Sequence, residues 1–498
     1  MQLLWRKAVL LLVGATLMEL AMSQGSSPAP SPNSGERTPP FWLGYATSAP
    51  QIEGANATDG KGPSIWDVFA TIPGKIKDGS TGALADDFYH RYTSDIQLMQ
   101  SLGVKRFRMS IAWTRIYPQG DGSVNQKGLD FYAGLINNLL AAGIEPHVTL
   151  YHWDLPQALQ ERFGGWNSSQ VVEPFRQYAK TVFSAFGNRI KHWTTMNEPQ
   201  TFCFVGYSAG SHAPGIRDQR QAYNCVHNVL KAHAAVVQEF RTIVPGGKIS
   251  INLNSDWGEP YSASSPADKA AAQRMVEFWL GTFADPIYLG DWPASVKARI
   301  PYIPTITPEL AKALNGSCDY FALNHYTSWL VMDKLGGETM QGRGDYTQGQ
   351  YYADGSPLGN PAQSDWLKDT PWGFRKILNW VKYRYQPKEL IVTENGFSVK
   401  GEASKALADV LDDTERVAFY RGYVNAAIDA VEQDQVPMTG YFAWSLLTNW
   451  EWAVGYTEQF GVVNVDFKTE QRALKASARY LASRFAGAGS NTTIGRYD

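Results

Sequence analysis

Eight short segments with apolar or alternating patterns recur along the chain. They span residues 41–49, 104–113, 143–153, 190–199, 247–257, 318–328, 389–397 and 438–447. Between them, residues 92–103, 127–143, 171–187 and 414–433 carry apolar side chains at spacings of three and four, which is typical of amphipathic helices. Gly103 and Gly143 stand where two of these helices should end. Strands that alternate with helices in this way build a parallel sheet covered by helices.

Eight such units over residues 41–485 predict a single α/β domain, a (β/α)8 barrel with enlarged loops after its strands. An open, doubly wound sheet is the alternative. That fold usually has a glycine-rich phosphate loop after its first strand, and residues 46–55 do not form one. Residues 24–40, rich in Pro and Ser, should be a disordered linker, and residues 486–498 a flexible tail.

Two of the predicted strands end in an acid beside an amide. Glu198 lies in "TMNEP" at the end of the fourth strand, and Glu394 lies in "VTENG" at the end of the seventh. Catalytic groups of such barrels gather at the carboxyl ends of the strands, so both acids can face one bound molecule. Glu198 alone also fits a plain helix start, because acids and a proline such as Pro199 favour the first helical turn.

A pair of carboxyl groups facing a sugar is what cleavage of a glycosidic bond requires. One protonates the leaving oxygen, and the other attacks the anomeric carbon or activates water. A separation of about 5 to 5.5 Å belongs to a retaining enzyme, and about 6.5 to 9.5 Å to an inverting one. The other strand ends add aromatic and amide side chains, which suit a polar pocket with stacking walls.

The overall composition describes a globular chain without a strong charge. Of its 498 residues, 44% are hydrophobic and 18% charged, with a formal net charge of -2. This balance argues against nucleic acid or an anionic membrane surface as a partner. Aromatic residues reach 13%, including 17 Trp, and they suit sugar faces as well as core packing. We therefore expect a small-molecule partner and leave the oligomeric state open.

The first 23 residues have the layout of a signal peptide. Arg6 and Lys7 precede an apolar run that ends near Met18, and small residues surround a cleavage position after Ser23. The apolar run is too short to span a bilayer comfortably, and an uncleaved anchor is the alternative. Four sequons, at Asn56, Asn167, Asn315 and Asn491, agree with a secreted or lumenal glycoprotein that is not inserted in the membrane after cleavage.

Three cysteines, without a CxxC pair, argue against a disulfide framework and against a cysteine-rich metal site. Cys225 lies on an apparent helix, where a small buried hydrophobic residue is the favoured interpretation. A single bridge, such as one from Cys203 to Cys225, stays open, as does the state of Cys318.

A series of motifs resembles glycoside hydrolase family 1, the retaining β-glucosidase family. In chain order they are "QIEGA", "GKGPSIWDVF", "FRMSIAWTRIYPQG", "TLYHWDLPQAL", "TMNEP", "LNHYTS", "VTENG" and "WSLLTNWEWAVGYTEQFGVVNVDFKT". The resemblance runs in register from about residue 41 to 485. It implies a retaining β-glycosidase that acts on β-glucosides, with β-galactosides or β-fucosides as further substrates, and that needs no metal and no organic cofactor.

The resemblance also implies roles for individual residues. Glu198 would be the general acid/base and Glu394 the nucleophile, so the two need different pKa values. Arg108 and Tyr326 would orient Glu394. The residues implied to bind the sugar are Gln51, His152, Trp153, Asn197, Trp444, Glu451, Trp452 and Phe460. Trp113 more simply packs in the core, and Trp257 and Trp372 fit either the walls of the leaving-group site or ordinary packing.

Some positions discriminate within the family, and others depart from its pattern. Glu198 is Glu rather than the Gln of thioglucosidase-type members, and the acid at Glu451 disfavours a phosphorylated sugar. Thr448 and Val454 stand where the family usually has Asp, and Trp450 and Pro50 where it usually has Phe and Tyr. These departures flank the sugar site.

Two other functions compete with hydrolysis. A non-catalytic glycan- or receptor-binding relative on the same barrel typically loses one of the acids, and both are present here. A transglycosidase would use the same intermediate with an acceptor alcohol in place of water. The glycine-rich residues 333–371 follow the sixth strand and should shape the pocket mouth.

Overall fold

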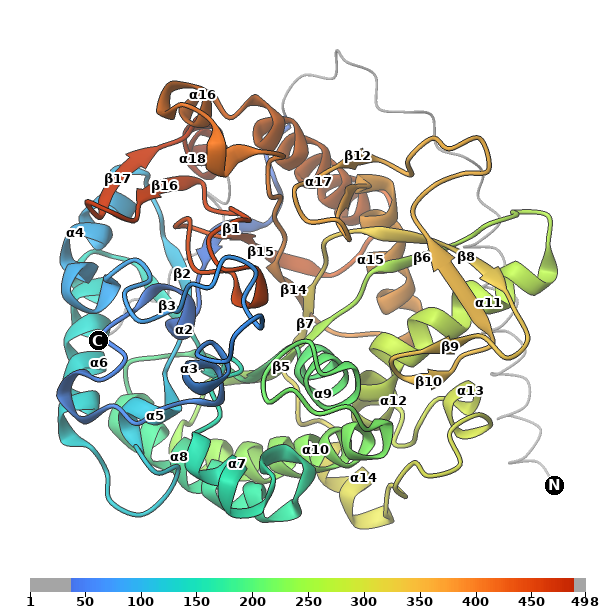
Figure 1. Cartoon of the computed structure of the whole chain (residues 1–498), viewed down its shortest axis with the longest axis horizontal. Coiled ribbons are helices and arrows are strands. Elements are labelled where there is room, and N and C mark those ends of the chain that lie inside the picture. The colour runs from blue at the N-terminus through green and yellow to red at the C-terminus, as the bar shows by residue number, and fades with distance from the viewer. Residues whose placement is uncertain (1–36, 488–498) are drawn as a thin grey trace.

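The computed structural model describes residues 37–487, whose centre is a closed barrel of eight parallel strands (Figure 1). In spatial order the strands are β1, β15, β14, β7, β5, β4, β3 and β2. Their bounds are Trp42–Ala46 for β1, Arg106–Ser110 for β2, Glu145–Tyr151 for β3, His192–Asn197 for β4, Lys248–Asn254 for β5, Phe321–Asn324 for β7, Leu390–Glu394 for β14 and Met438–Trp444 for β15. Every strand lies inside one of the eight predicted segments, so the predicted (β/α)8 barrel is confirmed.

An outer ring of helices covers the barrel, as Figure 1 shows in the view down its axis. Helices of this ring are α4 (Phe88–Ser101), α6 (Gln126–Ala141), α8 (Val172–Phe186), α10 (Gln219–Ile243), α12 (Thr282–Tyr288), α14 (Pro308–Leu314), α15 (Pro371–Tyr385), α17 (Thr414–Glu432) and α18 (Ala476–Gly487). Gly103 and Gly143 follow α4 and α6 with φ of 70° and 71°, the left-handed backbone that glycine adopts without a steric penalty. Among residues 37–487, no helix is long and apolar enough to cross a membrane.

The loops after the strands carry further short elements. A three-stranded sheet consists of β6 (Trp257–Pro260), β8 (Ser328–Asp333) and β11 (Tyr346–Gly349). Paired short strands are β9 (Glu338–Thr339) with β10 (Gly342–Arg343), β12 (Asn360–Pro361) with β13 (Lys368–Asp369), and β16 (Val463–Asp466) with β17 (Gln471–Leu474). The remaining helical segments are α2 (Ala49–Ile52), η1 (Thr58–Gly60), α3 (Ile65–Phe69), α5 (Trp113–Ile116), α7 (Gln157–Phe163), η2 (Gly165–Asn167), η3 (Ser169–Val171), α9 (Pro199–Phe204), η4 (Val205–Ala209), α11 (Pro266–Val276), η5 (Glu277–Gly281), α13 (Ala294–Lys297), η6 (Glu402–Ser404), α16 (Leu407–Asp412) and η7 (Trp452–Val454).

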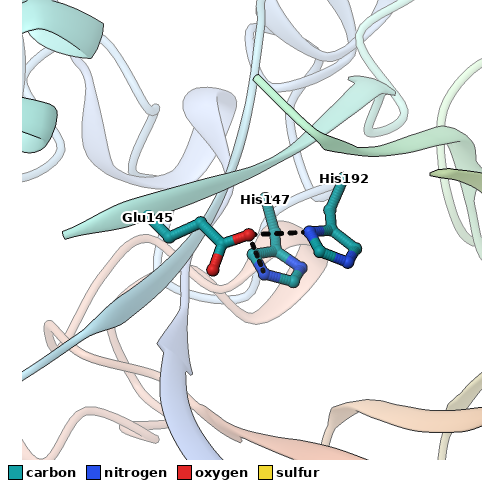
Figure 2. Close-up of side chains that lie close together, drawn as sticks. All are labelled: Glu145, His147 and His192. Carbon is teal, nitrogen blue, oxygen red and sulfur yellow. Dashed lines mark hydrogen bonds and ion pairs between the residues drawn. The ribbon is translucent and has the colours of Figure 1, made fainter. Parts of the chain in front are cut away.

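A cluster of charged and imidazole groups closes the amino-terminal end of the barrel (Figure 2). Glu145 and His192 are the first residues of β3 and β4, and His147 pairs with His192 in the parallel register. Glu145 Oε1 lies 2.8 Å from Nδ1 of His192 and 3.8 Å from Nε2 of His147, while Oε2 lies 3.2 Å from Nε of Arg106. Burial alone would raise the pKa of Glu145, but the His192 hydrogen bond and the neighbouring positive charges lower it to about 2.

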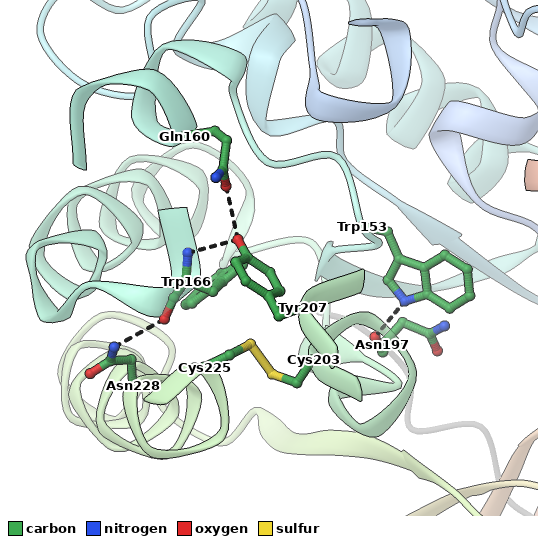
Figure 3. The surroundings of a disulfide bond; sticks show 8 residues. All are labelled: Trp153, Gln160, Trp166, Asn197, Cys203, Tyr207, Cys225 and Asn228. Atoms are coloured by element: carbon green, nitrogen blue, oxygen red, sulfur yellow. Dashed lines mark hydrogen bonds between the residues drawn. A yellow bond between two sulfur atoms is a disulfide. The ribbon is translucent and has the colours of Figure 1, made fainter. Parts of the chain in front are cut away.

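A disulfide joins α9 to α10 (Figure 3). Cys203 and Cys225 are bonded with a Cα–Cα distance of 5.6 Å, so the favoured interpretation of Cys225 as a simple hydrophobic residue is corrected: it is buried, but as half of a cystine. The spacing of the two residues did not decide this, because it says nothing of the packing of α9 against α10. Cys318 carries the free thiol among residues 37–487. The bond holds the helix that begins directly after Glu198.

Candidate active site

Glu394 is the last residue of β14 and receives a strong donor on each carboxylate oxygen. Arg108 Nη1 lies 2.6 Å from Oε1, and the hydroxyl of Tyr326 donates to Oε2 at 2.8 Å. Arg108 comes from the middle of β2 and Tyr326 from the segment after β7, so residues of three strand regions build this contact. The salt bridge is buried, with side-chain exposures of 2% and 4%. Two charge-stabilising donors hold the ionised carboxylate in one orientation.

Glu198 is held differently, at the junction of β4 and α9. It is the residue before α9 and has a left-handed backbone with φ of 47°, followed by Pro199 in the first helical position. Asn324 Nδ2 donates to Oε1 at 2.9 Å, and the hydroxyl of Thr201 donates to Oε2 at 2.9 Å. Burial, and next the charge of Glu394, raise the pKa of Glu198 to about 8. The acid is therefore mostly protonated at neutral pH.

A network of amides and imidazole ties the two acids together. Arg108 Nη2 donates to Asn197 Oδ1 at 2.6 Å, and Asn197 Nδ2 lies 3.0 Å from Nε2 of His152. The indole nitrogen of Trp153 donates to the Asn197 carbonyl at 3.0 Å. Burial, and next the charge of Arg108, keep the pKa of His152 well below its usual value, so the imidazole is neutral. A neutral imidazole can both donate and accept a hydrogen bond.

Aromatic rings enclose the same space. Trp153 and Trp452 have ring centroids 4.5 Å apart, and the His152 ring lies parallel to those of Trp444 and Trp452 at 5.8 and 5.9 Å. Phe460 contacts Tyr326 edge to face at 6.1 Å. Such faces accept the apolar face of a sugar ring.

Ten of the twelve predicted site residues line one cavity of about 800 Å³. They are His152, Trp153, Asn197, Glu198, Tyr326, Glu394, Trp444, Glu451, Trp452 and Phe460. The other two lie behind the lining. Arg108 donates to Glu394, and Gln51 Nε2 donates to Glu451 Oε2 at 3.0 Å and to Asn449 Oδ1 at 3.1 Å. Both therefore act on the cavity through an acid that faces it.

The prediction did not include several residues that support the acids. Asn324 and Thr201 hold Glu198, and Asn254 Nδ2 donates to the Thr201 hydroxyl at 3.0 Å. The signal for the two asparagines was their place at strand ends, and for Thr201 its position three residues after Glu198, one helical turn away. Trp113 packs in the core against Tyr178, as expected.

Trp257 and Trp372, considered as walls of the leaving-group site, do not line the cavity. The indole nitrogen of Trp257 donates to Glu259 at 2.7 Å, and the ammonium group of Lys376 lies over the ring of Trp372. Residues 333–371 supply such walls instead, because Glu338, Met340 and Trp366 all line the cavity.

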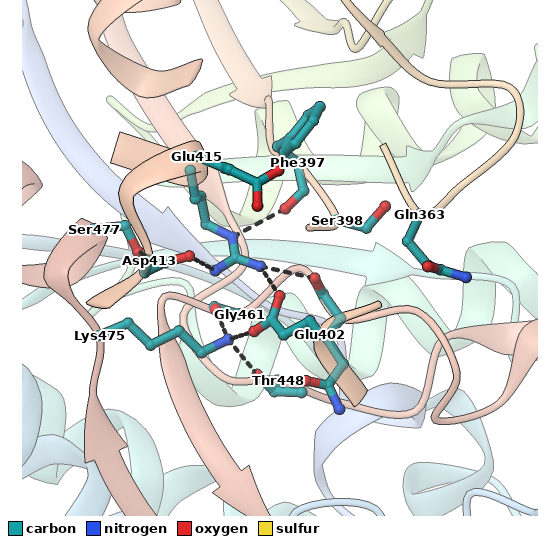
Figure 4. A network of polar contacts seen from close by, with 12 residues as sticks. Gln363, Phe397, Ser398, Glu402, Asp413, Glu415, Thr448, Gly461, Lys475 and Ser477 are labelled. Atoms are coloured by element: carbon teal, nitrogen blue, oxygen red, sulfur yellow. Dashed lines mark hydrogen bonds and ion pairs between the residues drawn. The ribbon is translucent and has the colours of Figure 1, made fainter. Parts of the chain in front are cut away.

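One of the departures near the sugar site, Thr448, is tied into a buried polar network (Figure 4). Lys475 Nζ lies 3.2 Å from the Thr448 hydroxyl, donates to the Gly461 carbonyl at 2.7 Å and pairs with Glu402. Trp450 is buried and its indole nitrogen donates to Ser80 at 3.1 Å. Burial, and next the charge of Arg416, lower the pKa of Lys475 to about 8. The hydroxyl of Thr448 thus contacts the ammonium group of Lys475, which is already paired with the carboxylate of Glu402.

Comparison with known proteins identifies the family of this barrel. The sequence model of "Glycosyl hydrolase family 1" matches residues 37–489. Beta-glucosidase 1B of Phanerodontia chrysosporium is 44% identical over 463 residues, covering 89% of this chain and 85% of that protein. Beta-glucosidase 42 of Arabidopsis thaliana is 43% identical over 459 residues, covering 89% and 93%.

Solved structures agree with the sequence relatives. A family 1 β-glucosidase from the fungus Humicola insolens, solved in complex with glucose, superposes with a TM-score of 0.88 at 41% identity, covering 91% of this chain and 99% of that one. The family 1 β-glucosidase of Thermotoga maritima gives a TM-score of 0.84 at 38% identity, covering 90% and 98%. The chain belongs to glycosyl hydrolase family 1 and is a retaining glycoside hydrolase.

Proposed function

We propose that the chain hydrolyses β-glucosides by double displacement, with Glu394 as nucleophile and Glu198 as general acid/base. The observation that carries this assignment is the contrast between the two acids. Arg108 and Tyr326 stabilise the charged form of Glu394, while burial and the charge of Glu394 raise the pKa of Glu198 to about 8. A nucleophile must begin ionised and a general acid must begin protonated.

The first half of the reaction cleaves the glycosidic bond. Glu394 attacks the anomeric carbon and forms a glycosyl ester, while Glu198 transfers its proton to the leaving oxygen. In the second half, Glu198 accepts a proton from water, which attacks the anomeric carbon and releases Glu394. Asn324 and Thr201 keep the acid aimed in both halves, because each donates to one of its oxygens.

The sugar would lie between the polar network and the aromatic walls. His152, Asn197 and Glu451 offer hydrogen-bonding groups to the hydroxyls, and Trp444 and Trp452 offer ring faces. Gln51 and Trp153 hold these groups in place. Among the residues that line the cavity, Lys77 carries the single ammonium group, and Glu451 would face any phosphate on the sugar, so a neutral glycoside is the favoured substrate.

Azide rescue tests the two roles separately. Glu394→Ala should lose turnover of a nitrophenyl β-glucoside, and azide should restore it with formation of the α-glucosyl azide, because azide attacks in place of the carboxylate. Glu198→Ala should instead give the β-glucosyl azide, formed from the intact covalent intermediate. Full activity of Glu394→Ala without azide, or the α-product from both variants, would overturn the assignment.

We also propose that the protein enters the secretory pathway and is glycosylated there. The apolar leader and the predicted cleavage after Ser23 support this proposal, although they lie outside the described residues. The disulfide of Cys203 suits an oxidising compartment. Among the three sequons within residues 37–487, Asn315 is the most open, because it is exposed, whereas Asn167 Oδ1 accepts a hydrogen bond from Asn224 at 2.9 Å.

Secretion can be tested by expressing the full chain in a eukaryotic host. The protein should appear in the medium, begin near Gln24, and lose mass on treatment with an N-glycan-cleaving enzyme. Asn315→Gln should remove one glycan. Retention of the intact leader inside the cell, without glycans, would contradict the proposal.

A further inference from the structure

The cavity continues outward from the catalytic pair into a region with apolar walls. Met275 of α11, Trp279 of η5 and Trp329 of β8 line this region, and Trp329 packs against the cluster that contains Met275. Met340 and Trp366 come from the loop of residues 333–371 and are exposed at the mouth. We call this set of five residues the outer wall. Flat indole faces and flexible thioethers suit a planar apolar group, so an aromatic leaving group fits here.

The charges that line the cavity are strongly unbalanced. Seven carboxyl groups line it, those of Glu198, Asp256, Glu338, Asp365, Glu394, Glu451 and Glu458, against the single ammonium group of Lys77. Burial keeps the pKa of His152 low and lowers that of His212 to about 4, so neither imidazole adds a positive charge at neutral pH. Burial raises the pKa of Asp256 to about 6.

Negatively charged groups still outnumber positively charged ones in the cavity when the protonation of the carboxyl groups is taken into account. Glu198, Asp256 and Glu451 have raised pKa values, and Arg108 pairs with Glu394. Leaving these four acids out still leaves three carboxyl groups, those of Glu338, Asp365 and Glu458, against one ammonium group. The cavity therefore carries a net negative charge at neutral pH. A concave site with one sign of charge and low-dielectric walls concentrates ions of the opposite sign.

The two acids at the mouth differ from their neighbours in the same loop. Asp345 is neutralised by Arg299 at 2.9 Å and by Arg343 at 2.7 Å. Within residues 37–487, neither Glu338 nor Asp365 forms a salt bridge. Arg343, opposite Glu338 in the β9–β10 register, and Lys368, near Asp365, interact with them electrostatically without pairing. An acidic rim is often only a solvated surface, but these two carboxyl groups line the cavity itself beside the outer wall. Both residues therefore stand where their charge can act on a leaving group in the cavity.

We propose that this cavity selects β-glucosides whose aromatic leaving group carries a positive charge over those of the same shape that carry a negative charge. Glu338 and Asp365 supply the discriminating field, and the indoles of the outer wall take the ring. A cation near Trp329 or Trp366 would gain a cation–π contact as well. The inference rests on the proposed β-glucosidase activity and names the class of leaving group that this activity prefers.

Three matched substrates test the proposal. They are the phenolic β-D-glucosides of 4-hydroxyphenethylamine, 4-hydroxyphenethyl alcohol and 4-hydroxyphenylacetate, whose leaving groups are cationic, neutral and anionic. Methylene groups separate the charge from the phenol, so the three leaving groups have similar intrinsic reactivity. We expect kcat/KM to fall in that order, with about tenfold between the first and the last at low ionic strength. At about 1 M salt, where the Debye length is about 3 Å, the difference should largely vanish.

A double variant and a matched control assign the effect to residues. Glu338→Gln with Asp365→Asn should reduce the preference to about twofold. The control, Glu161→Gln with Asp130→Asn, removes the same two charges from exposed positions outside the cavity, where each acid accepts a hydrogen bond from a glutamine one turn earlier. The control should keep the full preference, which separates the local field from the net charge.

The outcomes separate this inference from the proposed function. Equal kcat/KM for all three glucosides, or a preference that survives in the Glu338/Asp365 double variant, would overturn the inference and leave the β-glucosidase activity intact. Failure to hydrolyse the neutral glucoside as well would contradict the proposed function, and the inference would fall with it.

Discussion

The two ends of the barrel treat a buried acid in opposite ways. At the amino-terminal end, His192, His147 and Arg106 surround Glu145 and lower its pKa to about 2. At the carboxyl-terminal end, Glu198 lies at the end of the adjacent strand, and burial with the charge of Glu394 raises its pKa to about 8. Both are glutamates, one at the start of β3 and the other directly after the end of the neighbouring strand β4. The difference shows that the partners of an acid, rather than the fold, decide whether it stabilises or reacts.

The largest expected effect is on enzymatic activity, which should depend on the acid at one end of the barrel and not on the acid at the other. Glu394→Gln removes the proposed nucleophile and should lower kcat by about 10⁴-fold or more. Glu145→Gln, the same change at the other end, should leave kcat near the wild-type value, because Glu145 does not line the cavity. Initial rates with nitrophenyl β-glucoside check both variants. Comparable losses in the two would break the contrast.

The next effect concerns proton transfer. Glu198→Gln should lower kcat/KM for a glucoside with a poor leaving group by about 10³-fold, because a protonated acid assists departure by that order. A dinitrophenyl glucoside, whose leaving group needs no proton, should react in the first half-reaction almost as in the wild type. The wild type should lose activity as the pH rises above about 8, since Glu198 then gives up its proton. We call this fall in activity at high pH the basic limb of the pH profile. If Glu198→Gln showed the same basic limb, another group would be its cause.

A smaller effect concerns the contribution of Glu145 to the stability of the folded protein. The folded pKa of Glu145, about 2, lies below the ordinary glutamate value of 4.5, so its contribution to stability is present above pH 4.5 and is lost as the pH falls toward 2. The shift corresponds to about 3 kcal/mol of unfolding free energy. Glu145→Gln should therefore be less stable than the wild type at pH 6 by that order, and the gap should close near pH 2. Denaturant unfolding measures it, and a gap that does not change with pH would contradict the account.

The smallest expected effect concerns the hydrogen bond from Thr201 and its influence on the pKa of Glu198. The hydroxyl of Thr201 donates to Glu198 and lowers its pKa against the raising effect of burial. Thr201→Val should therefore move the basic limb of kcat/KM to higher pH, by under about one unit. Thr201→Ser, which keeps the hydroxyl, is the control and should retain the wild-type profile. A downward shift in Thr201→Val would show that the contact favours the protonated form.

The strands and the reacting acids were accessible from the sequence because they depend on local patterns. Each barrel strand has its own apolar segment, and Glu198 and Glu394 end two of them. The barrel predicted from these patterns is confirmed, as are the family and the enzymatic class that the motif resemblance implied. The individual roles of the site residues, the domain boundaries and the secretory route stay predictions.

What the sequence did not reveal depends on packing between distant segments. The hydrogen bond that places Gln51 behind Glu451 joins two residues that are 400 positions apart in the sequence. The bond of Cys203 to Cys225 follows from the packing of α9 on α10, and the outer wall depends on the path of residues 333–371. Loop conformations of this kind are set by long-range contacts and carry no periodic pattern in the sequence.

Trapping of the covalent intermediate tests the division of roles between the two acids most directly. A 2-deoxy-2-fluoro-β-glucoside with a dinitrophenyl leaving group should form a glycosyl ester that hydrolyses slowly, because the fluorine disfavours the oxocarbenium-like transition state. Peptide mass spectrometry should then find one fluoroglucosyl group on the peptide that contains Glu394. Labelling of Glu198, or turnover without any labelled peptide, would contradict the account.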